Sequence, residues 1–226
     1  MAYARLPLES EVSLRRDSPF SYDCAGCGRC CHDKGIRIGP YEALRLARAR
    51  GLSTTAFLAQ FTEAGGTVLR NRADGTCPFL AGHACEVHAD RPLVCRLYPL
   101  GRQVDPDGAE TFGLLAPQNG SEGRRGEAGT VAEFLRRQGV EPFLAVAARY
   151  AALYDRMLDV LSRLEPATPQ RLANDRSALD TGELASAWLD IDATVPTDTP
   201  QDPPTLVDLH VAALTRWLDE IEAHAT

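Results

Sequence analysis

The sequence predicts a mixed α+β fold dominated by helices, in which a small, irregular, cysteine-rich metal-binding domain with short hairpins precedes a helical C-terminal region. Three observations lead to this prediction. All seven cysteines fall between Cys24 and Cys95. Glycines and prolines interrupt short apolar runs in the same stretch, which is typical of tight turns and short elements. From Thr130 onward, apolar side chains recur at helical spacing instead.

Two short helices are expected between the two groups of cysteines. Pro40 fits the first turn of a helix, and Gly51 fits the position just past its end. Ser53 can cap a second helix, because its hydroxyl can accept a hydrogen bond from a free N–H of the first turn. Gly65-Gly66 then ends this second helix.

The second group of cysteines is expected to lie among small hairpins. Asp74-Gly75 is a hairpin-turn signal between residues 67–70 and 76–80, which are predicted to pair as strands. A further tight reversal is expected at residues 81–83. Residues 91–98 are predicted to form one helical turn, which the following proline stops.

The C-terminal half is predicted to be helical. Thr130 and Glu133 have the spacing of a capping box, in which each side chain bonds to the backbone of the other, and Gly139 ends that helix. A long helix is then expected from Pro142 through Leu164.

Shorter elements complete the predicted organisation. A helix is expected over residues 180–189, and four prolines make residues 193–204 a linker. A final helix presents apolar side chains on one side over residues 206–221. The predicted domains are a cysteine-cluster metal-binding domain at 1–117 and a helical C-terminal region at 118–226.

Composition narrows the class of protein. The net charge is −7, with 44% hydrophobic and 24% charged residues, as in an ordinary soluble protein. No apolar stretch is long enough for a transmembrane helix, and the N-terminus lacks the pattern of a secretory signal, so a cytoplasmic location is expected. Binding to nucleic acid is not expected, since there is no basic stripe to neutralise phosphates.

The acidic charge is concentrated near the C-terminus. Residues 180–226 hold ten Asp and Glu against one Arg, Arg216. Such a surface is either an ordinary solvated helical face or a docking site for a basic protein partner. The partner itself is not indicated by the sequence.

Closely spaced thiolates in a reducing compartment indicate metal chemistry more often than disulfides, and an odd number of cysteines also disfavours a closed disulfide framework. Cys24, Cys27 and Cys30 have the two-residue gaps often found in ligands of four-iron clusters, and Cys77 precedes a proline, as a distant fourth ligand often does. These features predict an iron–sulfur cluster, of the 4Fe–4S type.

Structural zinc is the competing interpretation. Cys24 and Cys27, followed by a glycine, resemble a zinc knuckle, and Cys85 with His88 could supply an opposing pair. Cys30 and Cys31 are adjacent, so they could serve two neighbouring centres, or one could stay free as a reactive thiol.

The candidate site residues follow from these patterns. Arg91 and Arg96 flank the last cysteine, where guanidinium groups would offset the negative charge of a thiolate-bound metal and lower thiol pKa values, so we expect them to contact the bound group. The alternative interpretation is that the two arginines make surface salt bridges or cap main-chain carbonyls. The predicted metal ligands are all seven cysteines: Cys24, Cys27, Cys30, Cys31, Cys77, Cys85 and Cys95.

The ordered motifs resemble the YkgJ-like CxxCxxCC cysteine-cluster family. The resemblance covers roughly residues 20–100 and rests on the run from Cys24 to Cys31, Cys77-Pro-Phe-Leu, Cys85, Arg91-Pro92 with Cys95-Arg96, and Tyr98-Pro99. It implies a zinc- or iron-chelating domain. Because the family includes flagellin lysine N-methylase, it also implies a link to an iron–sulfur centre and to S-adenosylmethionine.

Three functions remain open from the sequence. A redox or catalytic iron–sulfur protein, which could be related to methyl transfer, fits the cysteine spacing. However, no glycine-rich strand-to-helix loop supports S-adenosylmethionine binding. A structural zinc site in a protein-interaction module without catalysis fits the acidic C-terminal helices. Delivery of a metal ion to a partner is the third interpretation.

Overall fold

A computed structural model describes the chain in three stretches, residues 13–105, 107–164 and 188–224. The chain divides into two compact units, each built from two separate stretches. Unit 1 comprises residues 1–36 and 71–142, and unit 2 comprises residues 37–70 and 143–226. The fold is a mixture of helices and small antiparallel hairpins, as the sequence predicts. The predicted division into independent domains at residue 117 stays a prediction.

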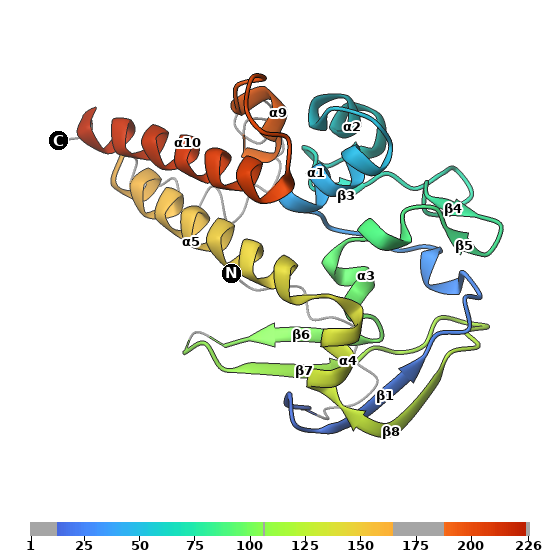
Figure 1. The fold of residues 1–226 in the computed structure, drawn as a ribbon. Helices are drawn as coiled ribbons and strands as arrows, with labels where there is room; N and C mark the ends of the chain where they lie inside the picture. The colour runs from blue at the N-terminus through green and yellow to red at the C-terminus, as the bar shows by residue number, and fades with distance from the viewer. Residues whose placement is uncertain (1–12, 106, 165–187, 225–226) are drawn as a thin grey trace. The chain divides into compact units, whose positions relative to one another are not determined.

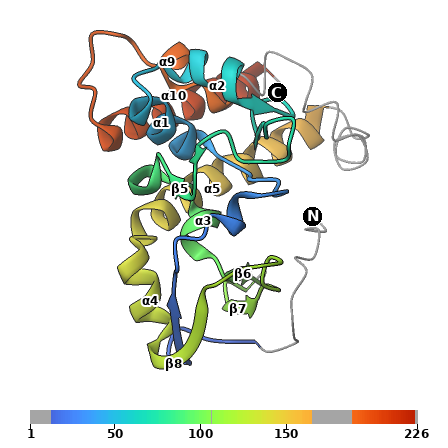
Figure 2. The ribbon, with the colours of Figure 1, turned by 90° about the vertical axis from the view of Figure 1, so that its right-hand side faces the viewer.

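Unit 1 is organised around an antiparallel pair of distant strands. Strand β1 (Pro19–Asp23) pairs with β8 (Arg124–Thr130), as Figure 1 shows. Helix α4 (Val131–Gln138) follows β8 directly and packs beside the same strands (Figure 2). The buried rings of Phe20 and Phe134 meet edge to face at 5.0 Å, so apolar contact holds the helix against β1.

The predicted cap of α4 is confirmed in detail. The Thr130 hydroxyl accepts the Glu133 N–H, and the Glu133 carboxylate accepts the Thr130 N–H. Gly139 takes a left-handed backbone conformation, with φ of 63°, at the other end.

A second hairpin of unit 1 joins β6 (Leu100–Val104) to β7 (Glu110–Leu114). Phe112 is fully buried here, and Leu14 pairs with it through two backbone hydrogen bonds. Sequence analysis missed β1, β6, β7 and β8. Strands β6, β7 and β8 contain glycine and charged residues, and β1 is only five residues long, so no long alternating run of apolar residues marks these strands.

The remaining elements of unit 1 are short and carry cysteines. They are the 3-10 turns η1 (Arg29–Cys31) and η2 (His88–Asp90), the strands β4 (Leu80–Ala81) and β5 (Ala84–Cys85), and α3 (Leu93–Leu97). Strands β4 and β5 pair across the predicted reversal at residues 81–83. The helical turn predicted within residues 91–98 is confirmed as α3.

The hairpin predicted across Asp74-Gly75 is wrong. Strand β3 (Val68–Leu69) pairs with β2 (Thr62–Glu63), which continues directly from the preceding helix. The Asp74-Gly75 turn does form, since the Arg72 N–H bonds to the Thr76 carbonyl at 2.8 Å. The flanking segments have other partners: β3 pairs with β2 and Val68 also forms a bridge with Arg37, whereas Thr76 forms a bridge with His32.

Unit 2 contains the helices that the sequence predicts. Helix α1 (Pro40–Ala49) begins at its proline, and α2 (Thr54–Phe61) is capped by the Ser53 hydroxyl, which accepts the Ala56 N–H. Helix α5 (Glu141–Leu164) begins one residue before the predicted start at Pro142.

Two further helices follow the gap in the described residues. These are α9 (Ile191–Thr194) and α10 (Pro203–His224). They shorten the predicted linker at 193–204, because α9 includes its first two residues and α10 its last two. The helix predicted at 180–189 lies mostly outside the described residues.

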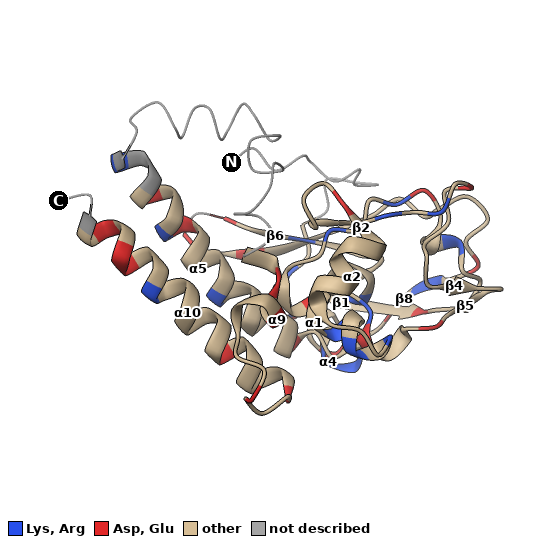
Figure 3. Cartoon of the chain, turned by 90° about the horizontal axis from the view of Figure 1, so that it is seen from above, with Lys and Arg blue, Asp and Glu red and all other residues tan. Residues whose placement is uncertain are grey.

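Ion pairs connect α5 with α10 inside unit 2. Arg149 binds Asp208, Arg156 binds Asp219, and both Arg156 and Arg163 bind Glu222. Figure 3 shows the blue and red positions along the two helices. Several acidic residues of the C-terminal segment are therefore neutralised within the unit, and the expected docking of a basic protein partner stays a prediction.

No helix in the described stretches of the chain is both long enough and apolar enough to cross a bilayer.

Candidate metal centre

The two groups of cysteines are brought together by backbone pairing within unit 1. The Cys77 N–H donates to the Cys31 carbonyl at 2.8 Å, and His32 forms an antiparallel bridge with Thr76. This short pairing holds the end of the first cysteine group beside the start of the second.

Gly28 makes a second contact between the two groups. Its φ of 70° is left-handed, and a Cβ at this position would lie 3.2 Å from Leu80 Cδ1 and 3.3 Å from the His83 carbonyl oxygen. Glycine therefore allows both the turn into η1 and the close approach of the β4–β5 hairpin.

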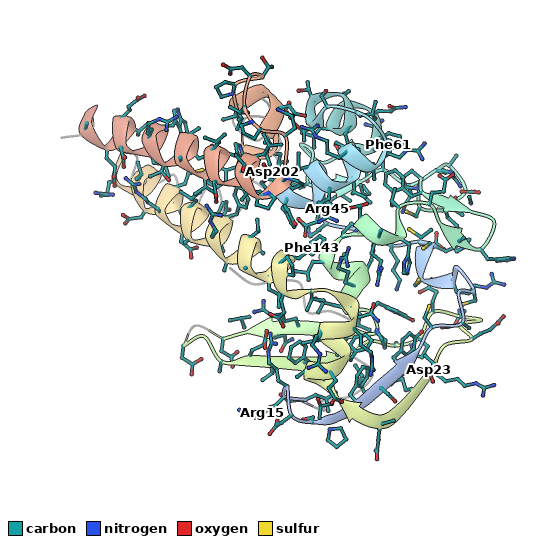
Figure 4. The ribbon with its side chains drawn as sticks, in the orientation of Figure 1. Arg15, Asp23, Arg45, Phe61, Phe143 and Asp202 are labelled. Carbon is teal, nitrogen blue, oxygen red and sulfur yellow. The ribbon has the colours of Figure 1, made fainter. Side chains whose placement is uncertain are left out.

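The seven predicted ligands lie on several different elements. All seven are free thiols; Cys24 is exposed, and the other six are partly buried. Cys24 and Cys27 follow β1, Cys30 and Cys31 lie in η1, Cys77 precedes β4, Cys85 ends β5, and Cys95 lies in α3. Figure 4 draws the side chains of the described residues as sticks, with sulfur atoms in yellow.

Cys30 and Cys31 form the closest sulfur pair. Their Sγ atoms are 4.0 Å apart, so one thiol can donate a hydrogen bond to the other. The hydrogen bond lowers the pKa of Cys30, helped by the charges of Lys34 and Arg91, whereas the same bond and burial raise the pKa of Cys31. The pair therefore holds one thiolate near neutral pH.

Cys77 and Cys85 share a local geometry. Burial raises the pKa of each thiol, and each sulfur accepts a hydrogen bond from the N–H two residues later, from Phe79 and Val87 respectively. Such N–H donors favour the thiolate form that binds metal.

The thiol of Cys95 interacts electrostatically with the thiols of three other cysteines. Burial, together with the neighbouring thiolates of Cys77, Cys30 and Cys85, raises its pKa to about 12. These four sulfurs therefore lie within electrostatic reach of one another. Enclosed thiols that repel one another as thiolates are the groups that a bound cation would stabilise.

The donor set fits a thiolate-bound metal. Zn–S bonds of about 2.3 Å in a tetrahedron place ligand sulfurs roughly 3.8 Å apart, close to the 4.0 Å between Cys30 and Cys31. Within the described stretches, no three His, Cys, Asp or Glu side chains are already drawn together tightly enough to hold an ion.

Comparison with known families identifies the cysteine-bearing segment. A family model matches residues 23–115, which include all seven cysteines. The matched model is that of the CxxCxxCC family. Its description is "putative zinc- or iron-chelating domain", which supports metal chelation in general and confirms the resemblance inferred from the motifs. No curated protein and no solved structure matches the chain.

The two arginines that flank Cys95, Arg91 and Arg96, have different surroundings. Arg91 lowers the pKa of Cys30, Cys85 and Cys95 by its charge, although burial raises the pKa of the latter two overall. Arg96 is buried and donates to three main-chain carbonyls. Contact of either arginine with a bound cofactor stays a prediction.

His88 lies beside the guanidinium group of Arg91. Its Nδ1 is 3.2 Å from Arg91 Nη1, and burial, Arg91 and Arg96 lower its pKa. The neutral imidazole that results is the form that can bind a metal. Whether His88 is a ligand stays a prediction.

A loop after β7 borders the cysteines and was missed by sequence analysis. The Gln118 side chain donates to the His32 carbonyl at 3.4 Å. Tyr22 lies edge to face with Tyr98 at 5.9 Å, and burial raises its pKa to about 12. A Cβ on Gly123 would lie 1.9 Å from the Tyr22 hydroxyl, so only glycine fits there. The glycines at 120–126 indicate that the chain packs closely against another segment there, but they do not indicate that Tyr22 is the residue it packs against.

Proposed function

We propose that unit 1 holds a thiolate-bound iron–sulfur cluster of the 4Fe–4S type and that this centre has a redox role. The observation that carries the proposal is the mutual electrostatic influence of Cys30, Cys77, Cys85 and Cys95, which come from four separate segments of the chain. Four thiolates are what a four-iron cluster requires.

Two features favour a cluster over a single ion. Each thiolate of a four-iron cluster binds a different iron, so the sulfurs need not meet at one point. The cysteine sulfurs of this chain influence one another electrostatically. Among the described residues, however, no three potential ligands meet at one point. A four-iron cluster is compatible with both observations. The spacing of Cys24, Cys27 and Cys30 also matches the gaps of cluster ligands.

The protein would supply the bound group with thiolate ligands, N–H donors to their sulfurs and a nearby positive charge. Cys77 and Cys85 would bind it while their N–H donors reduce the negative charge on sulfur. Arg91 would offset the charge of the thiolates. A cluster would supply one-electron transfer when bound, and partial burial of the thiols would limit its contact with water.

A structural zinc site in an interaction module is the second candidate. Gly26 and Gly28 both have positive φ angles, of 64° and 70°, on either side of Cys27. Glycine-containing turns of this kind direct backbone amides toward sulfur in zinc knuckles. In this case the unit would have no redox chemistry, and the metal would act only on folding.

Purification without oxygen, followed by elemental analysis, tests the proposal. We expect iron and inorganic sulfide in equal amounts, a brown colour with absorption at about 400 nm, and loss of that absorption on reduction. Stoichiometric zinc in a colourless protein would replace the iron–sulfur proposal with the structural zinc site. A protein that binds neither metal would contradict both.

Methyl transfer is a separate extension of the proposal. It requires S-adenosylmethionine to bind the protein that carries the cluster. Calorimetric titration with S-adenosylmethionine measures this directly, and an absence of heat would remove methyl transfer while leaving the metal centre intact.

A further inference from the structure

Arg96 is buried and directs its whole guanidinium group at main-chain oxygens. The residue is 7% exposed. Its Nε donates to the Arg91 carbonyl at 2.9 Å, its Nη1 donates to the Gln138 carbonyl at 2.8 Å, and its Nη2 donates to the Ala89 carbonyl. A buried charge is costly unless it is hydrogen-bonded, so these acceptors are what allow the guanidinium to lie inside the unit.

The three carbonyls belong to segments that determine where two cysteines lie. Ala89 is in η2, which begins three residues after Cys85. Arg96 itself directly follows Cys95 in α3. One planar group therefore fixes the distance between the segment after Cys85 and the helix that carries Cys95.

The third carbonyl anchors this arrangement to α4, which lies beyond the segment that matches the family. Gln138 is the last residue of α4, where helix carbonyls lack partners within the helix. Arg96 satisfies one of them. Gly139 has a φ of 63°, and a Cβ there would lie 3.4 Å from Arg96 Nη1, so the left-handed glycine leaves room for the guanidinium.

Gln138 also binds the second arginine. Arg91 Nη2 donates to the Gln138 side-chain oxygen at 2.5 Å, and Arg91 Nη1 donates to the His88 carbonyl at 2.6 Å. A single residue of α4 thus accepts hydrogen bonds from both Arg91 and Arg96, from Arg96 through its main chain and from Arg91 through its side chain.

We propose that Arg96 is a positioning residue that holds Cys85 and Cys95 in register for the metal by docking on the C-terminus of α4, and that Gln138 completes this support from outside the CxxCxxCC segment. The inference rests on the proposed metal-binding function. Arg96 acts through the backbone and does not touch the metal. Lysine cannot replace it, because an ammonium group lacks the planar fork that reaches three fixed oxygens.

Titration of the full-length, metal-free protein with Co²⁺ under reducing conditions tests the inference. Thiolate-bound Co²⁺ absorbs visible light in bands that report ligand number and geometry. We expect Arg96→Gln to weaken Co²⁺ binding by about 10- to 100-fold, the usual effect of losing a group that orients a metal ligand. We also expect the visible bands to change, with Arg96→Lys affected in the same direction.

The matched control is Arg136→Gln. Arg136 is an exposed arginine two residues before Gln138 on the same helix, so its replacement removes the same charge nearby. We expect wild-type affinity and spectrum for this variant. Far-UV circular dichroism of each variant separates weakened binding from loss of the fold.

A second variant covers the case in which Arg96→Gln does not fold. Gln138→Leu keeps the size of the side chain and leaves the Gln138 carbonyl in place, but it removes the acceptor for Arg91. We expect about 3- to 10-fold weaker binding. If both Gln138→Leu and a folded Arg96→Gln showed wild-type affinity and spectrum, the positioning role of Arg96 would be overturned and the metal-binding proposal would stand. A wild-type protein that binds no Co²⁺ would overturn the inference, whereas the iron–sulfur proposal is tested separately by elemental analysis.

Discussion

The Cys77 N–H donates a 2.8 Å hydrogen bond to the Cys31 carbonyl oxygen, and this bond joins the two cysteine groups of the chain. It places the sulfur-bearing segments side by side through the backbone. The site is therefore partly organised by the fold, and a bound metal would complete it.

Loss of Cys95 is expected to abolish tight metal binding. Structural zinc sites gain about 10–16 kcal/mol from four ligands, so one thiolate contributes roughly 3 kcal/mol, or about 100-fold in affinity. Cys95→Ser keeps the size of the side chain but removes that thiolate. Elemental analysis and metal titration measure the effect. Val94→Ala, at an exposed neighbour in the same helix, should retain full metal content. Equal metal content in the two variants would exclude Cys95 as a ligand.

Metal removal is expected to loosen unit 1 selectively. Its cysteine-bearing elements are short, so their ordering depends on the energy of metal binding. Hydrogen exchange measured by mass spectrometry should show faster exchange in residues 23–36 and 71–98 after chelation. Amides within α10 of unit 2 should be unchanged and serve as the internal control. Unaltered exchange after verified metal removal would mean that the metal has no structural role.

Cys30 is expected to be the most acidic thiol of the Cys30–Cys31 pair in metal-free protein. The hydrogen bond from Cys31 lowers its pKa, so Cys30 should be a thiolate and react with iodoacetamide at neutral pH, whereas Cys31 should react only at alkaline pH. Cys31→Ala removes the donor, which should raise the pKa of Cys30 and slow its alkylation. Mass spectrometry of peptides over a pH series gives both profiles. A Cys30 profile that does not change in Cys31→Ala would rule out the hydrogen bond between the two thiols.

The ion pair between Arg48 and Asp192 is expected to stabilise unit 2 above about pH 4. Burial raises the pKa of Asp192, but the hydrogen bonds from Arg48, at 2.7 and 2.9 Å, and from the Thr54 N–H lower it more, to below its usual 3.8. A carboxylate with a lowered folded-state pKa stabilises the protein above its unfolded-state pKa, and this contribution disappears as the pH falls through the folded value.

Asp192→Asn should therefore reduce the free energy of unfolding by about 1–3 kcal/mol at pH 7, and by less as the pH falls below about 4. Urea denaturation over a pH series measures this difference. Asp208→Asn is the matched control, because its pair with Arg149 is more exposed and worth about 0–1 kcal/mol. A difference that does not vary with pH would show that Asp192 acts by packing and not by charge.

Local signals in the sequence were sufficient for several elements. Ser53 and Thr130 cap the helices that their spacing predicts, because a cap depends only on residues within one turn. The pair of distant strands β1 and β8 was missed because its stability comes from packing against α4 and not from an alternating pattern. The hairpin at Asp74-Gly75 was mispredicted for a related reason: a turn signal specifies the reversal, but not which strands pair around it.

The sequence by itself determined the chemistry of this protein: seven soft sulfur donors within Cys24–Cys95, at the spacing of metal ligands, in a segment recognisable as CxxCxxCC. Tertiary structure decided how those donors are held. The meeting of Cys31 with Cys77, and the burial of Arg96 against Gln138, join residues that are far apart along the chain. Contacts of this kind depend on the backbone path between the residues, and no local pattern of side chains encodes that path.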